Sequence, residues 1–334
     1  MIKLVWRTDV HMADQGPSSR TDDWPATVLD KLGQVRDLAW KIRADAILDG
    51  GDFFHIKSPG RNSHELVQRV AEHHAHYPCP VYCTPGNHDS VYGDYAFLGQ
   101  QPLGVLFSSG VFRRLYDEHE AQFENTSDDI TVKVRVVGIP YHGTAYDMER
   151  FRSIKKGDED VLICVAHVLA SQKGGTMFEG EDIVRYGDLL DTAPDVFFFG
   201  HWHKDQGVEV LGDKTFVNVG SLTRGALSQD EVQRQPACVV LTVAPRPGMT
   251  AEVTAEIVRL QVRPAEEVFD LEGRARQVKQ QVDMDSFVER IRTSLAPRTT
   301  EETLQQSVEA VLDIPSDVKE RALAYLERVD DGRV

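Results

Sequence analysis

Five short apolar segments of this chain each end in residues that can bind a metal ion. Runs of this length without polar alternation are typical of buried strands, and PVYC, LICVA and VFFFG show the pattern. The polar residues that follow the five segments are, in chain order, Asp9 and His11, Asp52 and His55, Asn87 and His88, His167, and His201 and His203. The fold of this chain must therefore bring five strand ends together.

The rest of the pattern indicates a mixed α/β protein. A strand over Ile2 to Trp6 is followed by apolar residues at helical spacing from Val28 to Ile42, and then by a second strand in DAILDGGD. Later strands, such as DVFFFGHWH and TFVNVGS, leave little room for helices between them. This rhythm favours a two-sheet α/β sandwich over a single doubly wound sheet.

The pattern changes near the C-terminus. After about Val262 it becomes helical, with apolar residues in two stripes: Leu304, Val308 and Leu312, and Val318, Ala322, Tyr325 and Val329. We expect a catalytic domain over residues 1–262 and a small C-terminal helical appendage over residues 263–334 that binds a partner. Two helices that pack on each other or on the body are the alternative.

The composition limits the partners and the location. Lysine and arginine number 37 against 53 acidic residues, for a formal net charge of −16. This argues against nucleic-acid binding by the whole surface, but bound divalent cations can reverse the potential at a local site. No segment approaches the length of a membrane span, and the start MIKLVWRTDVH lacks the features of a signal peptide. We expect a cytoplasmic protein with no membrane partner.

The ligand types point to phosphate ester chemistry at two metal ions. Two divalent ions about 3.5–4 Å apart can hold a phosphate and activate a water, and Asp52 is the natural bridge between them. Because residues two apart in extended backbone project to the same side, Asp9 and His11 are expected to bind one ion together, with His203. Asn87, His167 and His201 are expected to complete the other ion.

The neighbours of Asn87 are expected to act on the substrate. We expect His88 to steady the phosphate or to protonate the leaving oxygen, and Asp89 to orient a nearby imidazole. Mixed histidine and carboxylate ligands suit Mn, Fe, Co or Zn better than Mg or Ca. Mn is the expected metal, with Fe, Co, Zn or Mg as alternatives. The cluster His73, His74 and His76 is expected to bind no metal, with His73 on the apolar face of a helix and the others in solvent.

The ordered motifs TDVH, GGDFFH, GNHD, AH and GHWH resemble those of the calcineurin-like metallophosphoesterase superfamily. The resemblance implies a two-sheet α/β sandwich with a di-metal site at the strand ends and a catalytic His88. It also implies metal ligands at Asp9, His11, Asp52, Asn87, His167, His201 and His203.

Two longer stretches, LDGGDFFHIKSPGRNSHELV and NVGSLTRGALSQDE, are similar to DNA repair nucleases of the SbcD and Meiotic Recombination Eleven type, and the tail resembles that of phage recombination nuclease subunits. This implies an exonuclease or endonuclease that acts on DNA in repair and recombination with an SMC-like ATPase subunit of the SbcC type. It also implies that His55 serves the active site. The alternatives are a stand-alone phosphodiesterase or phosphomonoesterase acting on nucleotides, and a scaffold with a vestigial site. A homodimer is one option for the assembly.

Overall fold

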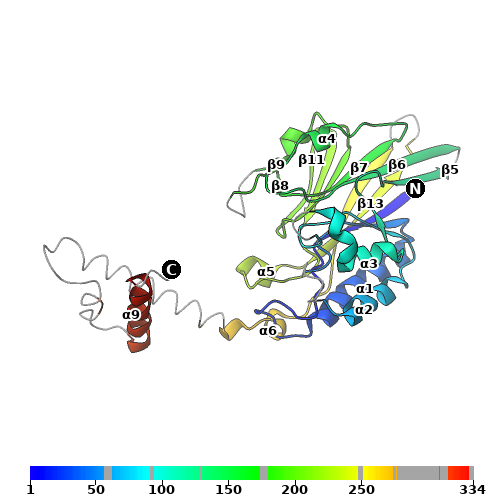
Figure 1. Ribbon diagram of the computed structural model, residues 1–334. Coiled ribbons are helices and arrows are strands. Elements are labelled where there is room, and N and C mark those ends of the chain that lie inside the picture. The colour runs from blue at the N-terminus through cyan, green and yellow to red at the C-terminus, as the bar shows by residue number, and fades with distance from the viewer. Residues whose placement is uncertain are drawn as a thin grey trace. The chain divides into compact units, whose positions relative to one another are not determined.

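The computed structural model describes residues 1–55, 62–90, 94–127, 129–173, 180–246, 251–273, 276, 308 and 315–330. The chain divides into two compact units, Met1–Phe269 and Asp270–Val334 (Figure 1). All the residues of the expected metal centre lie in the first unit.

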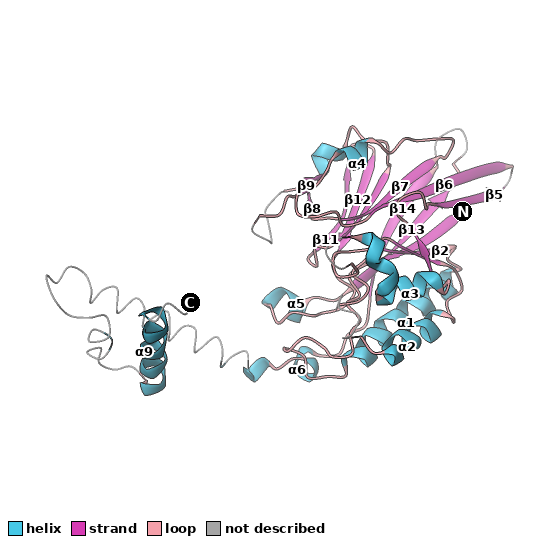
Figure 2. Cartoon of the chain, in the orientation of Figure 1, coloured by secondary structure: helices cyan, strands magenta, loops and turns pink. Residues whose placement is uncertain are grey.

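Two six-stranded sheets form the first unit (Figure 2). The first sheet has the order β14 (Glu252–Arg259), β13 (Ala237–Ala244), β1 (Ile2–Arg7), β2 (Ala46–Asp49), β3 (Val81–Cys83) and β4 (Phe112–Arg114). The second has the order β11 (Asp205–Leu211), β12 (Lys214–Val219), β10 (Val196–Gly200), β7 (Val161–His167), β6 (Ile130–Ile139) and β5 (Ala121–Ser127). In each sheet four neighbouring strands run parallel, β1 to β4 in the first and β12, β10, β7 and β6 in the second.

Helices cover the outer faces of the sheets. Those on the first sheet are α1 (Trp24–Ile42), α2 (His64–His74) and α3 (Pro102–Ser108), which lie together along it in Figure 1. The shorter elements are η2 (Tyr95–Gln100), α4 (Glu149–Arg152), η3 (Tyr186–Leu189), α5 (Gln229–Gln233) and α6 (Ala265–Val268), with a small sheet of β8 (Ala170–Ser171) and β9 (Val184–Arg185).

Three apolar cores hold these layers together. Side chains of β1 point alternately to the two faces of its sheet. Leu4 and Trp6 belong to the core between the two sheets, and Val5 belongs to the core between the first sheet and its helices. A third core lies on the outer face of the second sheet, where Phe151 of α4 and Tyr186 of η3 are fully buried. The layers are therefore helix, sheet, sheet and helix, and the predicted two-sheet α/β sandwich is confirmed.

The stretch from Asp117 to Asp129 contains no basic residue, which indicates a solvated loop or edge. It contains β5, an edge strand whose side chains are mostly exposed. In the second unit, α9 (Ser316–Asp330) confirms a C-terminal helix, and Val308 and Val318 are buried. The predicted apolar positions Leu304 and Leu312 lie outside the described residues. Among the described helices, none is both long and apolar enough to cross a membrane.

A buried ion pair fixes the ends of β1 and β2. Arg7 Nε donates to Asp49 Oδ2 at 2.7 Å, and both side chains are fully buried. The same guanidinium contacts the Tyr77 hydroxyl and His74 Nε2, each at 2.9 Å. His74 also donates from Nδ1 to the carbonyl of Val70. The expectation that His74 faces solvent is therefore wrong. Its ring is buried and contacts the guanidinium of Arg7, which is distant in the sequence.

Removing one partner of this pair should destabilise the fold. In Arg7→Met the carboxylate of Asp49 stays buried without its cation, and we expect the free energy of unfolding in urea to fall by about 3–5 kcal/mol. Replacing both residues by apolar ones should cost less. Lys133→Ala, which breaks an exposed pair with Asp158, should leave the unfolding midpoint almost unchanged. An Arg7→Met protein as stable as the wild type would contradict this role.

Candidate metal centre

All the predicted ligands lie at the carboxyl ends of parallel strands. Asp9 and His11 follow β1, Asp52 follows β2, and Asn87 follows β3, all in the first sheet. The second sheet contributes the last residue of β7, His167, and the residues after β10, which are His201 and His203. The two sheets pack so that these ends meet, which is how five separate segments reach one site.

Four of these residues have an unusual backbone. Asp9 and His11 have φ values of 51°, Asp52 has 50° and His201 has 88°. These values lie in the left-handed region, which residues other than glycine rarely adopt. The Asp9–His11 pair therefore does not use the extended geometry that we expected. Each side chain is aimed by a turn just beyond its strand, and such strain is concentrated at functional sites.

Backbone hydrogen bonds hold these turns in place. The N–H of Asp9 donates to the carbonyl of Gly51 at 3.0 Å, and the N–H of His11 donates to the carbonyl of Asp52 at 3.0 Å. The third turn, which follows β3 and contains Gly86, lies so close to Asp52 that a Cβ on Gly86 would be 2.1 Å from Asp52 Oδ1. The φ of Gly86 is not in the left-handed region. Glycine is therefore required at position 86 by the lack of space for a side chain and not by its backbone conformation.

Two groups of side chains can each hold an ion. They are Asp9, His11 and His203, and Asp52, His167 and His201. In the first group, His203 Nε2 lies 2.9 Å from His11 Nε2 and 3.5 Å from Asp9 Oδ1. In the second, His167 Nε2 lies 3.4 Å from Asp52 Oδ2, and Asn87 Oδ1 lies 3.2 Å from the same nitrogen.

These spacings fit ligands that share ions. Two ligand atoms bound at about 2.1 Å to one ion lie roughly 3.0–4.2 Å apart, depending on the angle at the ion. Asp52 Oδ2 is also 4.0 Å from His11 Nε2. This one carboxylate oxygen therefore lies at a ligand-to-ligand distance both from His167 in its own group and from His11 in the first group. His167 donates from Nδ1 to the carbonyl of Gly50 at 2.6 Å, which turns its Nε2 toward the centre. The residues present therefore fit two ions with Asp52 between them.

The charges of the centre also favour cations. Burial opposes ionisation of Asp9, but the hydrogen bond and charge of His203 outweigh it and lower the pKa of Asp9 to about 2. Burial likewise opposes ionisation of Asp52, yet His167 holds the pKa of that carboxyl well below its usual range. Burial would lower the pKa of His167, but the charge of Asp52 raises it to about 9. Without metal the two carboxylates are thus stabilised by protonated imidazoles, and a bound metal ion would take the place of those protons.

His88 and His55 lie together at the edge of the centre. Their rings stack with centroids 5.3 Å apart, and His88 donates from Nδ1 to the carbonyl of His55 at 2.7 Å. The N–H of His88 donates to Asp52 Oδ1 at 2.7 Å. His55 Nδ1 lies 3.2 Å from His11 Nδ1, and the three histidines could also hold an ion. Such an ion would share His11 with the first group.

Asp89 has other partners than expected. Its carboxylate accepts hydrogen bonds from the backbone N–H groups of Gly86 at 2.9 Å, Phe54 at 3.3 Å and Phe53 at 3.4 Å. The expected role of orienting an imidazole is therefore replaced by a structural one, in which Asp89 ties the third turn to the second. Burial and the charge of Asp52 raise the pKa of Asp89 to about 8, against these hydrogen bonds.

Two side chains near the centre were missed by sequence reasoning. Glu181 Oε1 lies 2.9 Å from His201 Nε2, and the ring of Tyr141 lies 5.3 Å from that of His201. Both belong to irregular segments between strands. Neither has a spacing that relates it to the other ligands, so no sequence signal distinguishes them from ordinary loop residues.

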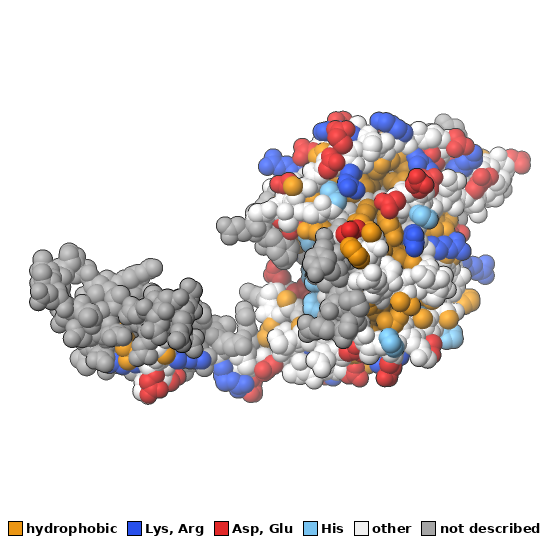
Figure 3. Space-filling view, viewed as in Figure 1, with side chains coloured by type: hydrophobic (Ala, Val, Ile, Leu, Met, Phe, Trp, Pro, Cys, Tyr) orange, Lys and Arg blue, Asp and Glu red, His pale blue; other side chains and the backbone are white. Residues whose placement is uncertain are grey.

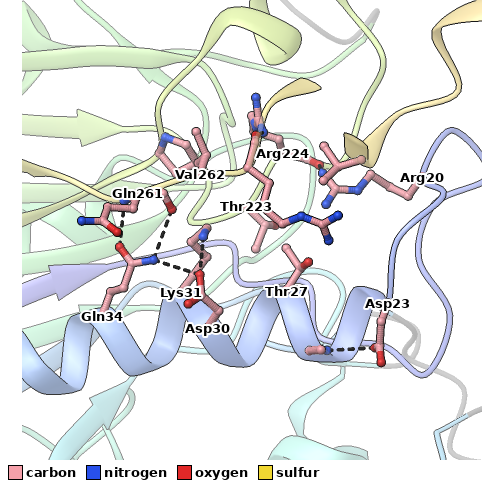
Figure 4. Close-up of a pocket in the computed structure, with 14 residues that line it drawn as sticks. Arg20, Asp23, Thr27, Asp30, Lys31, Gln34, Thr223, Arg224, Gln261 and Val262 are labelled. Atoms are coloured by element: carbon pink, nitrogen blue, oxygen red, sulfur yellow. Dashed lines mark hydrogen bonds and ion pairs between the residues drawn. The ribbon is translucent and has the colours of Figure 1, made fainter. Parts of the chain in front are cut away.

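A separate cavity of about 400 Å³ lies beside α1 (Figure 4). Figure 4 shows residues of α1, including Thr27 and Asp30, facing Thr223 and Arg224 across it. None of its 14 described lining residues is a predicted metal ligand. Its connection to the centre is indirect, since the Thr223 hydroxyl donates to the carbonyl of Val10 in the first turn at 3.3 Å.

Comparisons with known proteins agree with this geometry. Residues 3–205 match a model of the calcineurin-like phosphoesterase family. A search of curated proteins found no match. A solved structure of a candidate 5′-nucleotidase from Staphylococcus aureus is similar, with 16% identity and a TM-score of 0.50 over 78% of this chain. The match spans 55% of that longer chain.

Two other solved structures are similar at lower scores. A dimetal phosphatase from Danio rerio is 11% identical over 78% of this chain and 97% of its own, with a TM-score of 0.45. An archaeal phosphodiesterase is 14% identical over 77% of this chain and 100% of its own, with a TM-score of 0.35. At such identities the likeness concerns the fold alone.

The family match covers more than half of the chain and includes every predicted ligand. Members of this family use a dinuclear metal centre, and the paired groups around Asp52 are able to bind metal ions. The chain belongs to the calcineurin-like phosphoesterase family, which implies metal-dependent hydrolysis of phosphoesters.

Proposed function

We propose that this chain is a DNA nuclease subunit that hydrolyses phosphodiester bonds in repair or recombination, together with an SMC-like ATPase. The single observation that carries the proposal is the stacked pair of His55 and His88 beside the first ligand group. It is supported by the similarity of the GGDFFH and GSLTRGAL stretches to repair nucleases. We propose Mn as the metal.

The chain's own residues then divide the work. Two bound divalent ions would hold the phosphate and supply the Lewis acidity that activates a water for in-line attack. His88 is held by its N–H on Asp52 and by its Nδ1 on the carbonyl of His55. Because Nδ1 is occupied, Nε2 is the nitrogen that can reach the substrate. With both nitrogens protonated, the imidazolium would transfer its Nε2 proton to the leaving oxygen and remain as the neutral ring with Nδ1–H on the carbonyl of His55.

An accessible centre suits a polymeric substrate. His55 is exposed, and the side chain of His203 is 41% exposed, so the first ligand group is open to solvent on one side. On the face shown in Figure 3, acidic and basic side chains are interspersed over the larger unit. Attraction of DNA to the metal centre would therefore depend on local charge such as bound metal rather than on the summed protein charge.

A substrate panel tests the proposal. With Mn²⁺ present, we expect the purified protein to cleave duplex or single-stranded DNA faster than nucleotide monoesters, and Asp52→Ala to lose both bound metal and all hydrolysis. Metal content and turnover should be measured on the same samples. A preference for nucleotide monoesters would favour the stand-alone phosphoesterase instead. An Asp52→Ala protein that kept two ions and normal turnover would contradict the bridge.

His88→Ala should separate catalysis from metal binding. Loss of a general acid typically lowers turnover by about 100- to 10,000-fold, and we expect an effect in that range with both ions retained. His142→Ala is a suitable control, since His142 contacts the carbonyl of Pro140 and the N–H of Asp147 in a turn. Loss of metal in His88→Ala would mean that His88 is itself a ligand.

We also propose that the C-terminal unit binds the ATPase. A helix with an apolar stripe can dock into a groove of a partner, and the sequence of α9 carries such a stripe at Val318, Ala322, Tyr325 and Val329. Truncation before Thr299 should abolish co-purification with the ATPase and ATP-stimulated cleavage of duplex DNA, while a small artificial phosphodiester is still hydrolysed. If the truncated protein still binds the ATPase, the interface lies elsewhere. Loss of small-substrate hydrolysis would make the tail part of the catalytic fold.

A further inference from the structure

A carboxylate outside both ligand groups contacts one of the proposed ligands. Glu181 lies in the segment between β8 and β9, and its Oε1 is 2.9 Å from His201 Nε2. The side chains of Glu181 and His201 are only 7% and 8% exposed. A buried carboxylate in direct contact with an imidazole is an interaction that water does not weaken.

Glu181 is held firmly in this position. The hydroxyl of Tyr146 donates to the same carboxylate oxygen, and this hydroxyl accepts a hydrogen bond from the N–H of Leu169 at 3.0 Å. The backbone is fixed as well. The N–H of Tyr146 donates to Asp182 Oδ2 at 3.2 Å, and the N–H of Asp182 donates to the carbonyl of Thr144 at 2.8 Å. These hydrogen bonds of Glu181 and Asp182 therefore hold the carboxylate of Glu181 in contact with His201.

The contact determines which nitrogen of His201 carries the proton. An ionised carboxylate only accepts hydrogen bonds, so Nε2 of His201 must be the N–H. In a neutral imidazole the other nitrogen, Nδ1, then carries the lone pair that can bind an ion.

The two histidines of the second group thus present different nitrogens. His167 donates from Nδ1 to the carbonyl of Gly50 and presents Nε2, whereas His201 donates from Nε2 to Glu181 and presents Nδ1. Among the described His, Cys, Asp and Glu side chains, those that can share this ion are Asp52, His167 and His201, and Glu181 does not belong to this group. Glu181 therefore acts through His201 rather than on the ion.

We propose that Glu181 is a positioning residue for the second metal ion. It fixes the ring angle and the proton of His201, and its charge makes the ligating nitrogen more basic, as carboxylates behind metal-binding histidines do. The inference rests on the proposed assignment of His201 as a metal ligand. Glu181 would raise the affinity for the ion that His201 binds and would leave the affinity for the other ion unchanged.

Titration of the full-length protein with Mn²⁺ in a calorimeter tests this. Loss of such a carboxylate typically weakens metal binding by about 10- to 100-fold. We expect Glu181→Ala to weaken binding of one ion by this factor and to leave the other unchanged. Glu181→Gln, which keeps an acceptor oxygen without the charge, should fall between Glu181→Ala and the wild type. Equal affinities in all three proteins would overturn the proposal, and tighter binding in Glu181→Ala would mean that Glu181 competes with the ion.

A spectroscopic measurement separates positioning from a general loss of structure. In ¹⁵N NMR of the imidazole rings, recorded with a chelator present, His201 should be the Nε2–H tautomer in the wild type. It should become a mixture of tautomers in Glu181→Ala. Tyr146→Phe, which removes one support of Glu181, should weaken the same ion by a smaller factor. An unchanged tautomer in Glu181→Ala would overturn the proposal even if that variant were less stable.

Glu159→Gln provides the matched control. Glu159 is also a buried carboxylate, with its side chain 6% exposed and paired with Arg135. It lies before the first residue of β7, at the opposite end of that strand from His167. Its replacement should alter neither affinity. If the wild type itself binds fewer than two ions, the metal assignment fails; if it binds two and Glu181→Ala binds both as tightly, only the role of Glu181 fails.

Discussion

The carboxylate of Asp52 joins the two sheets at their carboxyl ends. Asp52 follows β2 of the first sheet, and its Oδ2 faces His167 at the end of β7 in the second sheet, 3.4 Å away. Two residues earlier, the carbonyl of Gly50 accepts a hydrogen bond from the same ring at 2.6 Å. Because a buried charge is costly without partners, these contacts fix where the sheet ends meet. The other predicted ligands are arranged around this point.

The ligand turns depend on support from below. Each left-handed residue other than glycine costs on the order of 1–3 kcal/mol and persists only where its surroundings determine it. The ion pair of Arg7 and Asp49 joins the last residues of β1 and β2. These residues lie two positions before Asp9 and three positions before Asp52. Above this pair, the N–H of His201 donates to both oxygens of Asp9 at 3.1–3.2 Å. The strained turns are thus held by the Arg7–Asp49 ion pair at the strand ends and by the hydrogen bonds from His201 to the side chain of Asp9.

Much of this centre could be predicted because ligand-type residues directly follow apolar strands, and parallel strands of one sheet end on the same side. The turn geometry could not be predicted, since the φ of Asp9 is set by Gly51, which is distant in the sequence. The partners of His74 and Asp89 were missed for the same reason. Glu181 lies in an irregular loop whose position depends on Tyr146 and Asp182, and no periodicity marks such a residue.

The centre also explains how an acidic protein can act on a phosphate ester. A formal net charge of −16 repels polyanions at a distance, and the ionised Asp9 and Asp52 add to that repulsion locally. Two divalent cations held by the two ligand groups would more than offset these carboxylates and would attract phosphate locally. The same ions would supply the Lewis acidity that activates water. Binding of a phosphate ester and its hydrolysis would therefore both depend on metal binding.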